Sequence, residues 1–208
     1  MKKNKNEITK WLSSVNDKAT EKFDQMDKVR EYAYATHREL IKISSLSIRA
    51  THRKEFNEAK ELLKKADDIL NVLKEKLGNF SEIYYAGFVH DAQKEVAEAN
   101  ITYALIKGEA APQPEDINVD YPAYLNGLGE AVGELRRYVL DSIRHKEYND
   151  YEKVMSMMDE IYYLLTSLDY PDAVTKGLRR TTDVTRSIIE KTRGDLTTHF
   201  MLKNLSRD

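Results

Sequence analysis

The sequence predicts an all-α protein, and two features of its composition support that fold class. Only eight glycines and four prolines occur in 208 residues, so few positions interrupt a helix. Charged residues make up 33% of the chain, a content that suits long helices. The length is typical of one domain with its own core, so we expect a single helical domain over residues 1–208.

Breakers and turn residues divide the chain into about seven expected helices. In order, they cover residues 7–18, 20–52, 54–77, 80–107, 121–146, 148–168 and 171–192, followed by a C-terminal tail over 192–208. Gly78 ends the third helix, and the segment before Pro171 ends the sixth. The longest loop is expected at 108–122, because Gly108 and three prolines interrupt the helical pattern there. No fixed sequence period is found, which argues against a solenoid of repeats.

Several classes of protein are excluded by what the sequence lacks. There are no cysteines, so neither a disulfide framework nor a cysteine-ligated metal site is expected. The initial MKKNKNEITKWL carries lysines without a following apolar run, unlike a signal peptide. No segment approaches the roughly 18 consecutive apolar residues of a membrane span. We therefore expect a soluble cytoplasmic protein with no membrane partner.

The net charge of −2 conceals an uneven distribution. Residues 1–54 contain 13 basic and 7 acidic side chains, whereas residues 55–135 contain 7 basic and 16 acidic ones. Such asymmetry permits a basic surface for phosphates beside an acidic patch for a cation.

The expected helix 80–107 carries a group of acidic residues on one side. At about 100° per residue, Asp91, Glu95 and Glu98 fall within a single narrow arc. Carboxylates at this spacing can converge on one hard cation, because Mg²⁺ and Mn²⁺ prefer oxygen ligands. The competing interpretation is ordinary surface charge, which is the commoner reason for this spacing when it occurs alone.

The expected helix 121–146 has a polar stripe opposite an apolar one. The polar stripe consists of Glu130, Glu134, Arg137, Asp141 and Arg144. This pattern alone indicates only an amphipathic surface helix. The unusual feature is a set of three interior glycines, Gly127, Gly129 and Gly133. Each costs up to about 1 kcal/mol relative to alanine in a helix, which indicates close approach of another backbone or of a ligand.

Four segments together resemble the translin and translin-associated factor X family, in an archaeal-type form. They are DYPAYLNGLGEAVGELRRYVLDSI from residue 120, KEVAEA at 94–99, RELIKISSLSIRATHR at 38–53 and GLRRTTDVTRSIIEKTRGDLT at 177–197. The first is similar to the family signature built around Leu-x-Gly and Gly-Glu-Leu, and the second to a Glu-x-x-Glu-Ala segment of the catalytic branch, translin-associated factor X. The resemblance covers most of the chain and implies a helical bundle or superhelix that assembles into a closed homo-oligomer, an octamer, with tyrosine-rich surfaces between subunits.

The resemblance also implies a metal site. Glu95 and Glu98 match the paired glutamates of the catalytic branch, and Glu134 matches the glutamate of Gly-Glu-Leu. Glu130 stands where that branch has an aspartate, so the carboxylate is kept with one more methylene. Glu95, Glu98 and Glu130 are then the expected catalytic metal ligands for Mg²⁺ or Mn²⁺, with Glu134 and Asp91 as additional ligands. The implied activity is metal-dependent endonucleolytic cleavage of RNA.

The expected partner is short single-stranded or duplex RNA, with single-stranded DNA as a further possibility. For RNA contact the resemblance indicates Arg137 and the basic residues of the N-terminal helix, of which Arg49 and Arg53 share one face; Arg136 and Arg144 are secondary candidates. Arginine offers a fork of donors that suits phosphate. The competing interpretation is that these arginines pair with nearby glutamates.

Two other functions stay open. A translin-like oligomer that binds RNA or single-stranded DNA without cleaving it needs the arginines but not the carboxylates, and a helical scaffold needs neither. The five histidines show no ligand-like spacing and are interpreted as surface or packing residues; His90 beside Asp91, as a general acid or base for metal-free cleavage, is the less favoured mechanism.

Overall fold

The computed structural model describes residues 2–146 and 151–205, which form helices joined by short connections. The helices of these residues are α1 (Lys2–His52), α2 (Phe56–Leu77), α3 (Ser81–Tyr84), α4 (Gly87–Lys107), α5 (Tyr121–Arg144), α6 (Tyr151–Thr166), α7 (Asp172–Thr175) and α8 (Leu178–Leu205). No strand occurs in the described residues, so the predicted all-α class is confirmed. Within the same ranges, no helix combines the length and the apolar character that crossing a membrane requires.

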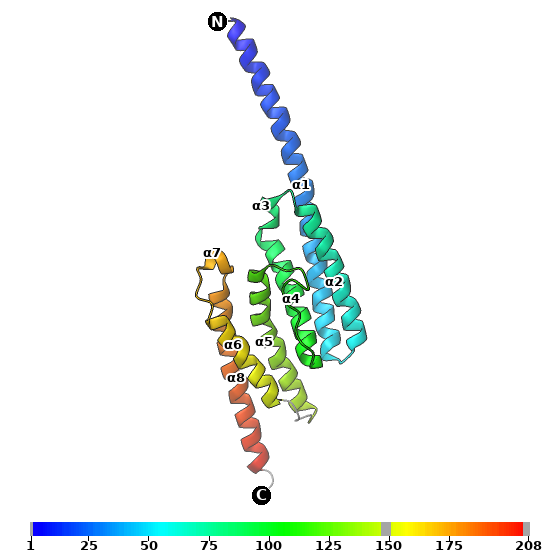
Figure 1. The fold of residues 1–208 in the computed structure, drawn as a ribbon, viewed down its shortest axis with the longest axis vertical. Coiled ribbons are helices and arrows are strands. Elements are labelled where there is room, and N and C mark those ends of the chain that lie inside the picture. The colour runs from blue at the N-terminus through cyan, green and yellow to red at the C-terminus, as the bar shows by residue number, and fades with distance from the viewer. Residues whose placement is uncertain (1, 147–150, 206–208) are drawn as a thin grey trace.

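The helices lie side by side, and each packs against its neighbours (Figure 1). Helix α1 packs against α2 and α4, α4 packs against α5, and α5 packs against α6 and α8. The main core runs through all of these helices and includes Leu40, Leu70, Val96, Leu135 and Met158. Because α4 and α5 lie between other helices, some of the polar side chains between them are partly shielded from water.

Close helix packing explains two of the three glycines of α5. A Cβ at Gly127 would lie 2.7 Å from the carbonyl oxygen of Lys94 and 2.9 Å from the Cβ of Ala97, too near for any side chain. At Gly129 an added Cβ would collide with Thr181 of α8. The predicted close approach is therefore confirmed at these two positions. At Gly133 the nearest atom is 3.8 Å away, an ordinary contact, so packing does not require glycine there.

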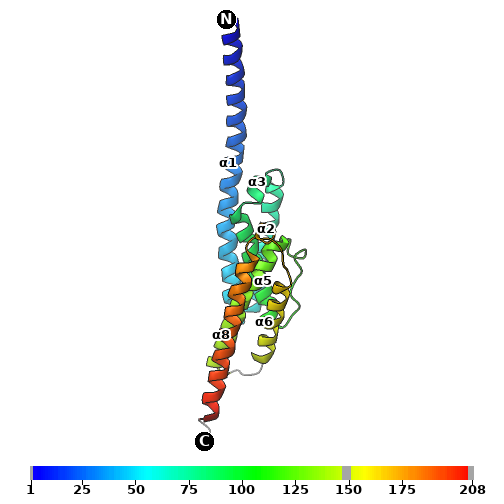
Figure 2. The same ribbon diagram turned by 90° about the vertical axis from the view of Figure 1, so that its left-hand side faces the viewer.

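The first half of α1 projects beyond the bundle as a single helix, which we call the N-terminal arm (residues 6–28; Figures 1 and 2). Nearly every side chain of the arm is exposed. Its large exposed apolar side chains recur at helical spacing and are Ile8, Trp11, Leu12, Val15 and Phe23. Helix α1 first packs against the core at Val29 and Tyr32. Its apolar face is therefore exposed to solvent along the N-terminal arm and buried along the second half of the helix.

Three expected helix boundaries were wrong. The helices predicted at 7–18 and 20–52 are one helix, because no glycine or proline interrupts this segment and its serine, asparagine and aspartate residues only weaken helix propensity. The helix predicted at 80–107 is divided between α3 and α4, because Ala86 adopts an extended conformation. The helix predicted at 171–192 is divided by Lys176 and Gly177, both with positive φ, and α8 then continues to Leu205. The long loop is confirmed between α4 and α5.

Candidate metal centre

Three glutamates from two neighbouring helices come together near the middle of the molecule. Glu95 and Glu98 lie on α4, and Glu130 lies on α5; one carboxylate oxygen of each lies within 4.8 Å of the others. The spacing of three residues places the first two on the same side of α4. The close contact at Gly127 holds the two helices near each other just before Glu130. The acidic sides of α4 and α5 therefore face each other, and we call these residues the acidic trio.

A hydrogen-bonded group holds the start of α5 in place relative to α4. The Asp120 carboxylate accepts hydrogen bonds from Lys74 Nζ at 3.1 Å and from Tyr84 Oη at 2.8 Å. The Asp120 backbone N–H donates to Gln93 Oε1 at 2.7 Å. Residues of α2, α3 and α4 therefore converge on the first turn of α5, which places Glu130 further along this helix beside α4.

The acidic trio carries unbalanced negative charge. Burial, followed by the negative charges of Glu95 and Glu130, raises the pKa of Glu98 to about 8. Burial also raises the pKa of Glu95, while the nearby ammonium of Lys94 opposes this change. Without a cation, Glu98 is therefore mainly protonated at neutral pH.

Lys94 partly compensates this charge. Its ammonium donates to a carboxylate oxygen of Glu130 at 2.8 Å, and the side chains are 19% and 38% exposed, respectively. Burial alone would lower the pKa of Lys94, but the hydrogen bond to Glu130 and the surrounding carboxylates raise it. One ammonium therefore faces three carboxyl groups.

Glu134, one turn after Glu130, has different neighbours. Its carboxylate contacts His52 Nε2 at 2.5 Å and lies 3.7 Å from Arg137 Nη1. The hydrogen bond from His52 lowers the pKa of Glu134, although burial opposes the change. His52 comes from the end of α1, and its side chain is only 5% exposed. The structure thus joins Glu134 to His52 and leaves it outside the acidic trio.

The acidic trio fits a hard divalent cation. All three donor groups are carboxylates, and oxygen ligands of this kind suit Mg²⁺ and Mn²⁺. Their oxygens lie close enough to share one ion. Burial is the main cause of the raised pKa of Glu98, and the neighbouring carboxylates, whose negative charge a cation would offset, raise it further. A divalent cation would replace both the proton and part of the role of Lys94.

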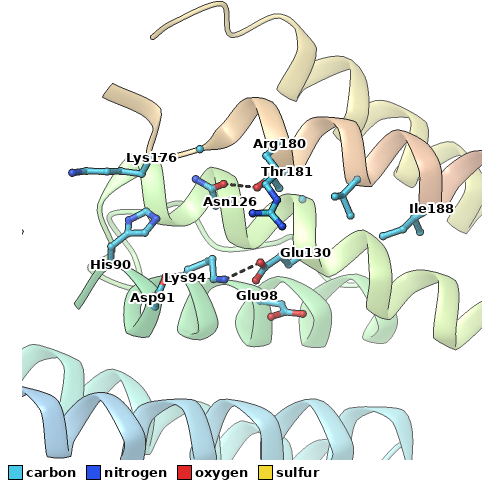
Figure 3. A pocket seen from close by; sticks show the side chains of 13 residues that line it. His90, Asp91, Lys94, Glu98, Asn126, Glu130, Lys176, Arg180, Thr181 and Ile188 are labelled. Atoms are coloured by element: carbon cyan, nitrogen blue, oxygen red, sulfur yellow. Dashed lines mark hydrogen bonds and ion pairs between the residues drawn. The ribbon is translucent and has the colours of Figure 1, made fainter. Parts of the chain in front are cut away.

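A pocket of about 590 Å³ opens beside the acidic trio, between α4, α5 and the beginning of α8 (Figure 3). Glu98 and Glu130 form part of its wall, as do Lys94 and Asp91. The opposite wall carries Lys176, Arg180 and apolar side chains of α8. The carboxylates are therefore accessible to a ligand larger than an ion.

Comparison with known proteins identifies relatives that cover most of the chain. No family model matches the sequence. An uncharacterized protein of Methanocaldococcus jannaschii is 30% identical over 175 residues, which is 83% of this chain and 77% of that protein. The solved structure of archaeal AfC3PO in complex with duplex RNA is 32% identical, with a TM-score of 0.82, and the match covers 89% of this chain and 96% of that chain. A crystal structure of AfC3PO gives a TM-score of 0.81 at the same identity, over 89% of this chain and 97% of that chain.

These C3PO structures are of the translin and translin-associated factor X type. The chain belongs to the translin family. Fungal apo-NeC3PO, at 20% identity and a TM-score of 0.80 over 88% of this chain and 96% of that chain, shares the fold. The family resemblance expected from the four sequence segments is thereby confirmed.

In this translin-family chain, four of the five arginines predicted to contact RNA form ion pairs. Arg53 pairs with Glu55 and Glu58, Arg136 with Asp195, Arg137 with Glu134 and Asp141, and Arg144 with Asp141. Arg49 is exposed on α1 and has no ion pair within the described residues. Four of the five arginines therefore pair with carboxylates in this structure, as the competing interpretation predicts.

Other charged residues around the site were not foreseen from the sequence of this translin-family chain. Lys94 was overlooked because lysine next to a glutamate is unremarkable in a charged helix. Lys176, just before α8, and Arg180, on α8, reach the pocket from a part of the chain distant from α4, and no local pattern connects them to it. Asp91, a predicted ligand, is exposed at the pocket wall; it is not part of the group whose oxygens lie within 4.8 Å of one another.

Proposed function

We propose that this protein is a Mg²⁺- or Mn²⁺-dependent endoribonuclease that binds and cleaves short single-stranded or duplex RNA within a homo-oligomeric particle. The observation that carries the proposal is the acidic trio, an all-oxygen donor set within 4.8 Å, two of whose members, Glu98 and Glu130, line an open pocket. AfC3PO, 32% identical to this chain, has been solved in complex with duplex RNA, which supports RNA as the ligand class.

Glu95, Glu98 and Glu130 would hold the cation. When bound, it would supply a Lewis acid that activates water and stabilises charge on the scissile phosphate and the leaving oxygen. Because Glu98 holds a proton until its pKa of about 8, cation binding requires this proton to leave. The apparent affinity for the cation should therefore increase as the pH rises toward 8.

Lys94 has a second role in this proposal. Its ammonium lies beside Glu130 at the pocket wall. If a cation bound the Glu130 carboxylate, the ammonium would be free to pair with a phosphate of bound RNA. Lys94 would thereby exchange a carboxylate partner for a phosphate oxygen, which keeps its charge paired in both states.

The runner-up is a translin-like protein that binds RNA or single-stranded DNA and cleaves neither. The ion pair between Lys94 and Glu130 favours it, because a direct ammonium partner already satisfies one of the three carboxylates. This function needs basic residues near the pocket but no cation.

Assembly into an octamer is part of the proposal. The N-terminal arm supports association, because its apolar side chains are open to solvent along one face of the helix. Light scattering at micromolar concentration should give a mass several times the 24.1 kDa of one chain. A monomer under these conditions would contradict the oligomeric particle.

The decisive experiment is cleavage of short RNAs by the purified protein with Mg²⁺, Mn²⁺ or EDTA. Glu95→Ala, Glu98→Ala and Glu130→Ala should each reduce the cleavage rate by about 100-fold or more while RNA binding is kept. Glu152→Ala, at an exposed position of α6, serves as the matched control and should cleave normally. Equal activity in EDTA, or in all three trio variants, would rule out the nuclease and favour the non-catalytic binder.

A further inference from the structure

The wall of the pocket that faces the acidic trio has an ordered pattern of its own. Arg180, Val184 and Ile188 follow one another at intervals of four residues along α8, and Lys176 lies two residues before the start of this helix. Residues four apart lie on the same helix face, so the three side chains of α8 line one side of the pocket, and Lys176 lines it as well. We call these four residues the α8 face. Figure 3 shows Lys176, Arg180 and Ile188 in succession along the pocket, opposite Glu130 and Glu98.

The cationic end of the α8 face is not neutralised. Neither Lys176 nor Arg180 forms an ion pair within the described residues, unlike Arg136 and Arg137 on α5. Both are exposed and line the same cavity. Two unpaired cations in one pocket form a site for an anion, and the planar guanidinium fork of Arg180 suits two oxygens of a phosphate.

The other end of the α8 face is apolar. Val184 is 51% exposed and Ile188 is partly buried beside it. Aliphatic side chains at this position offer an apolar surface next to the phosphate site. A base inside a duplex is stacked on both faces, so only an unpaired base can lie flat on such a surface.

We propose that the α8 face binds one unpaired nucleotide of an RNA strand, with its phosphate on Lys176 and Arg180 and its base on Val184 and Ile188. This inference rests on the proposed function only in taking RNA as the ligand. It adds that the strand is unpaired at this position, whether in a single strand or at a frayed or overhanging end of a duplex. The adjoining phosphate of the same strand would then lie toward the acidic trio.

The test is equilibrium binding of a short single-stranded RNA in EDTA, measured by fluorescence anisotropy at several salt concentrations. Lys176→Gln and Arg180→Gln should each weaken binding by about tenfold and reduce the slope of log affinity against log salt by about one. Arg179→Gln is the matched control, because it removes the same charge from the neighbouring residue, which lines a different pocket on another side of α8. It should bind nearly as the unchanged protein does.

The apolar end is tested separately. Val184→Ser and Ile188→Ser should weaken binding of the single strand while leaving the salt slope unchanged, and should have little effect on a blunt-ended duplex of the same length. Circular dichroism of each variant checks that it is folded. The proposal is overturned if the Lys176 and Arg180 variants bind like Arg179→Gln, or if the serine variants affect single strand and duplex equally. These experiments measure binding and not cleavage. If the protein binds RNA as expected here but does not cut it, the nuclease proposal is refuted and the proposal for the α8 face is retained.

Discussion

Glu130 and Glu134 are the same residue type, one turn apart on α5, yet the fold gives them opposite environments. Glu130 faces α4, where Lys94 is its ion-pair partner among the described residues and two further carboxylates lie within 4.8 Å. Glu134 faces the end of α1, where the hydrogen bond from His52 lowers its pKa. Helical spacing alone predicts the same environment for the two glutamates. Tertiary packing therefore decides the neighbours of each carboxylate: an ammonium and two further carboxyl groups for Glu130, and a buried imidazole for Glu134.

The largest expected effect comes from removing the partner of Glu134. His52→Ala deletes a buried imidazole and leaves a largely buried carboxylate without its hydrogen bond, so the free energy of unfolding should fall by about 3 kcal/mol. Urea unfolding followed by far-UV circular dichroism measures this loss. His145→Ala, at the exposed end of α5, is the control and should change stability by no more than about 0.5 kcal/mol. Equal losses in the two variants would show that the His52 contact is not special.

Metal ions should separate the two glutamates directly. Binding of Mn²⁺ at 100 times its dissociation constant should raise the free energy of unfolding by about 2.7 kcal/mol, seen as a higher melting temperature. Glu134→Gln should keep this response, whereas Glu130→Gln should lose most of it. If the two variants respond alike, the cation does not distinguish the acidic trio from the His52 pair, and our assignment of Glu130 as a ligand fails.

A smaller effect should appear in the pH dependence of stability, measured in EDTA. The folded-state pKa of Glu98 is about 8, above its ordinary value, so the stability contributed by its bound proton is complete below about pH 4.5 and lost as the pH rises through 8. Glu98→Gln cannot titrate, so its stability relative to the unchanged protein should improve as the pH rises from about 5 to about 9.

The sign is opposite for Glu134. Its pKa is lowered, so the stability from its charged form is present above its ordinary pKa and is lost as the pH falls through the lowered value. The stability deficit of Glu134→Gln should therefore be largest near neutral pH and shrink in acid. Parallel pH profiles for Glu98→Gln and Glu134→Gln would contradict the difference between the two sites.

Features that depend on local sequence could be predicted. The helical class, the loop after Gly108 and the arc of acids on α4 follow from breakers and periodicity, which involve residues close along the chain. The glycines of α5 indicated close packing, and Gly127 confirms it against α4. The assignment of Glu95 and Glu98 as a pair came from the family resemblance, and the structure places Glu130 beside them.

Features that depend on distant partners could not be predicted. His52 and Glu134 are 82 positions apart, and Lys94 and Glu130 are 36 apart, so no periodicity relates them. The same limit applies to Arg180, which enters the pocket from α8. Helix length was misjudged for another reason: residues such as Ser13 and Asp17 are common at helix ends, but inside a helix each costs only up to about 0.7 kcal/mol, and α1 continues through them.

The exposed position of the N-terminal arm has a spectroscopic consequence. The chain has a single tryptophan, Trp11, and it lies on the arm with 63% of its surface exposed, far from the packed core. Its emission therefore reports the surroundings of the arm and carries almost no signal from the core. Core unfolding should be nearly silent in tryptophan fluorescence, whereas anything that covers the arm should shift the emission to the blue without an added label.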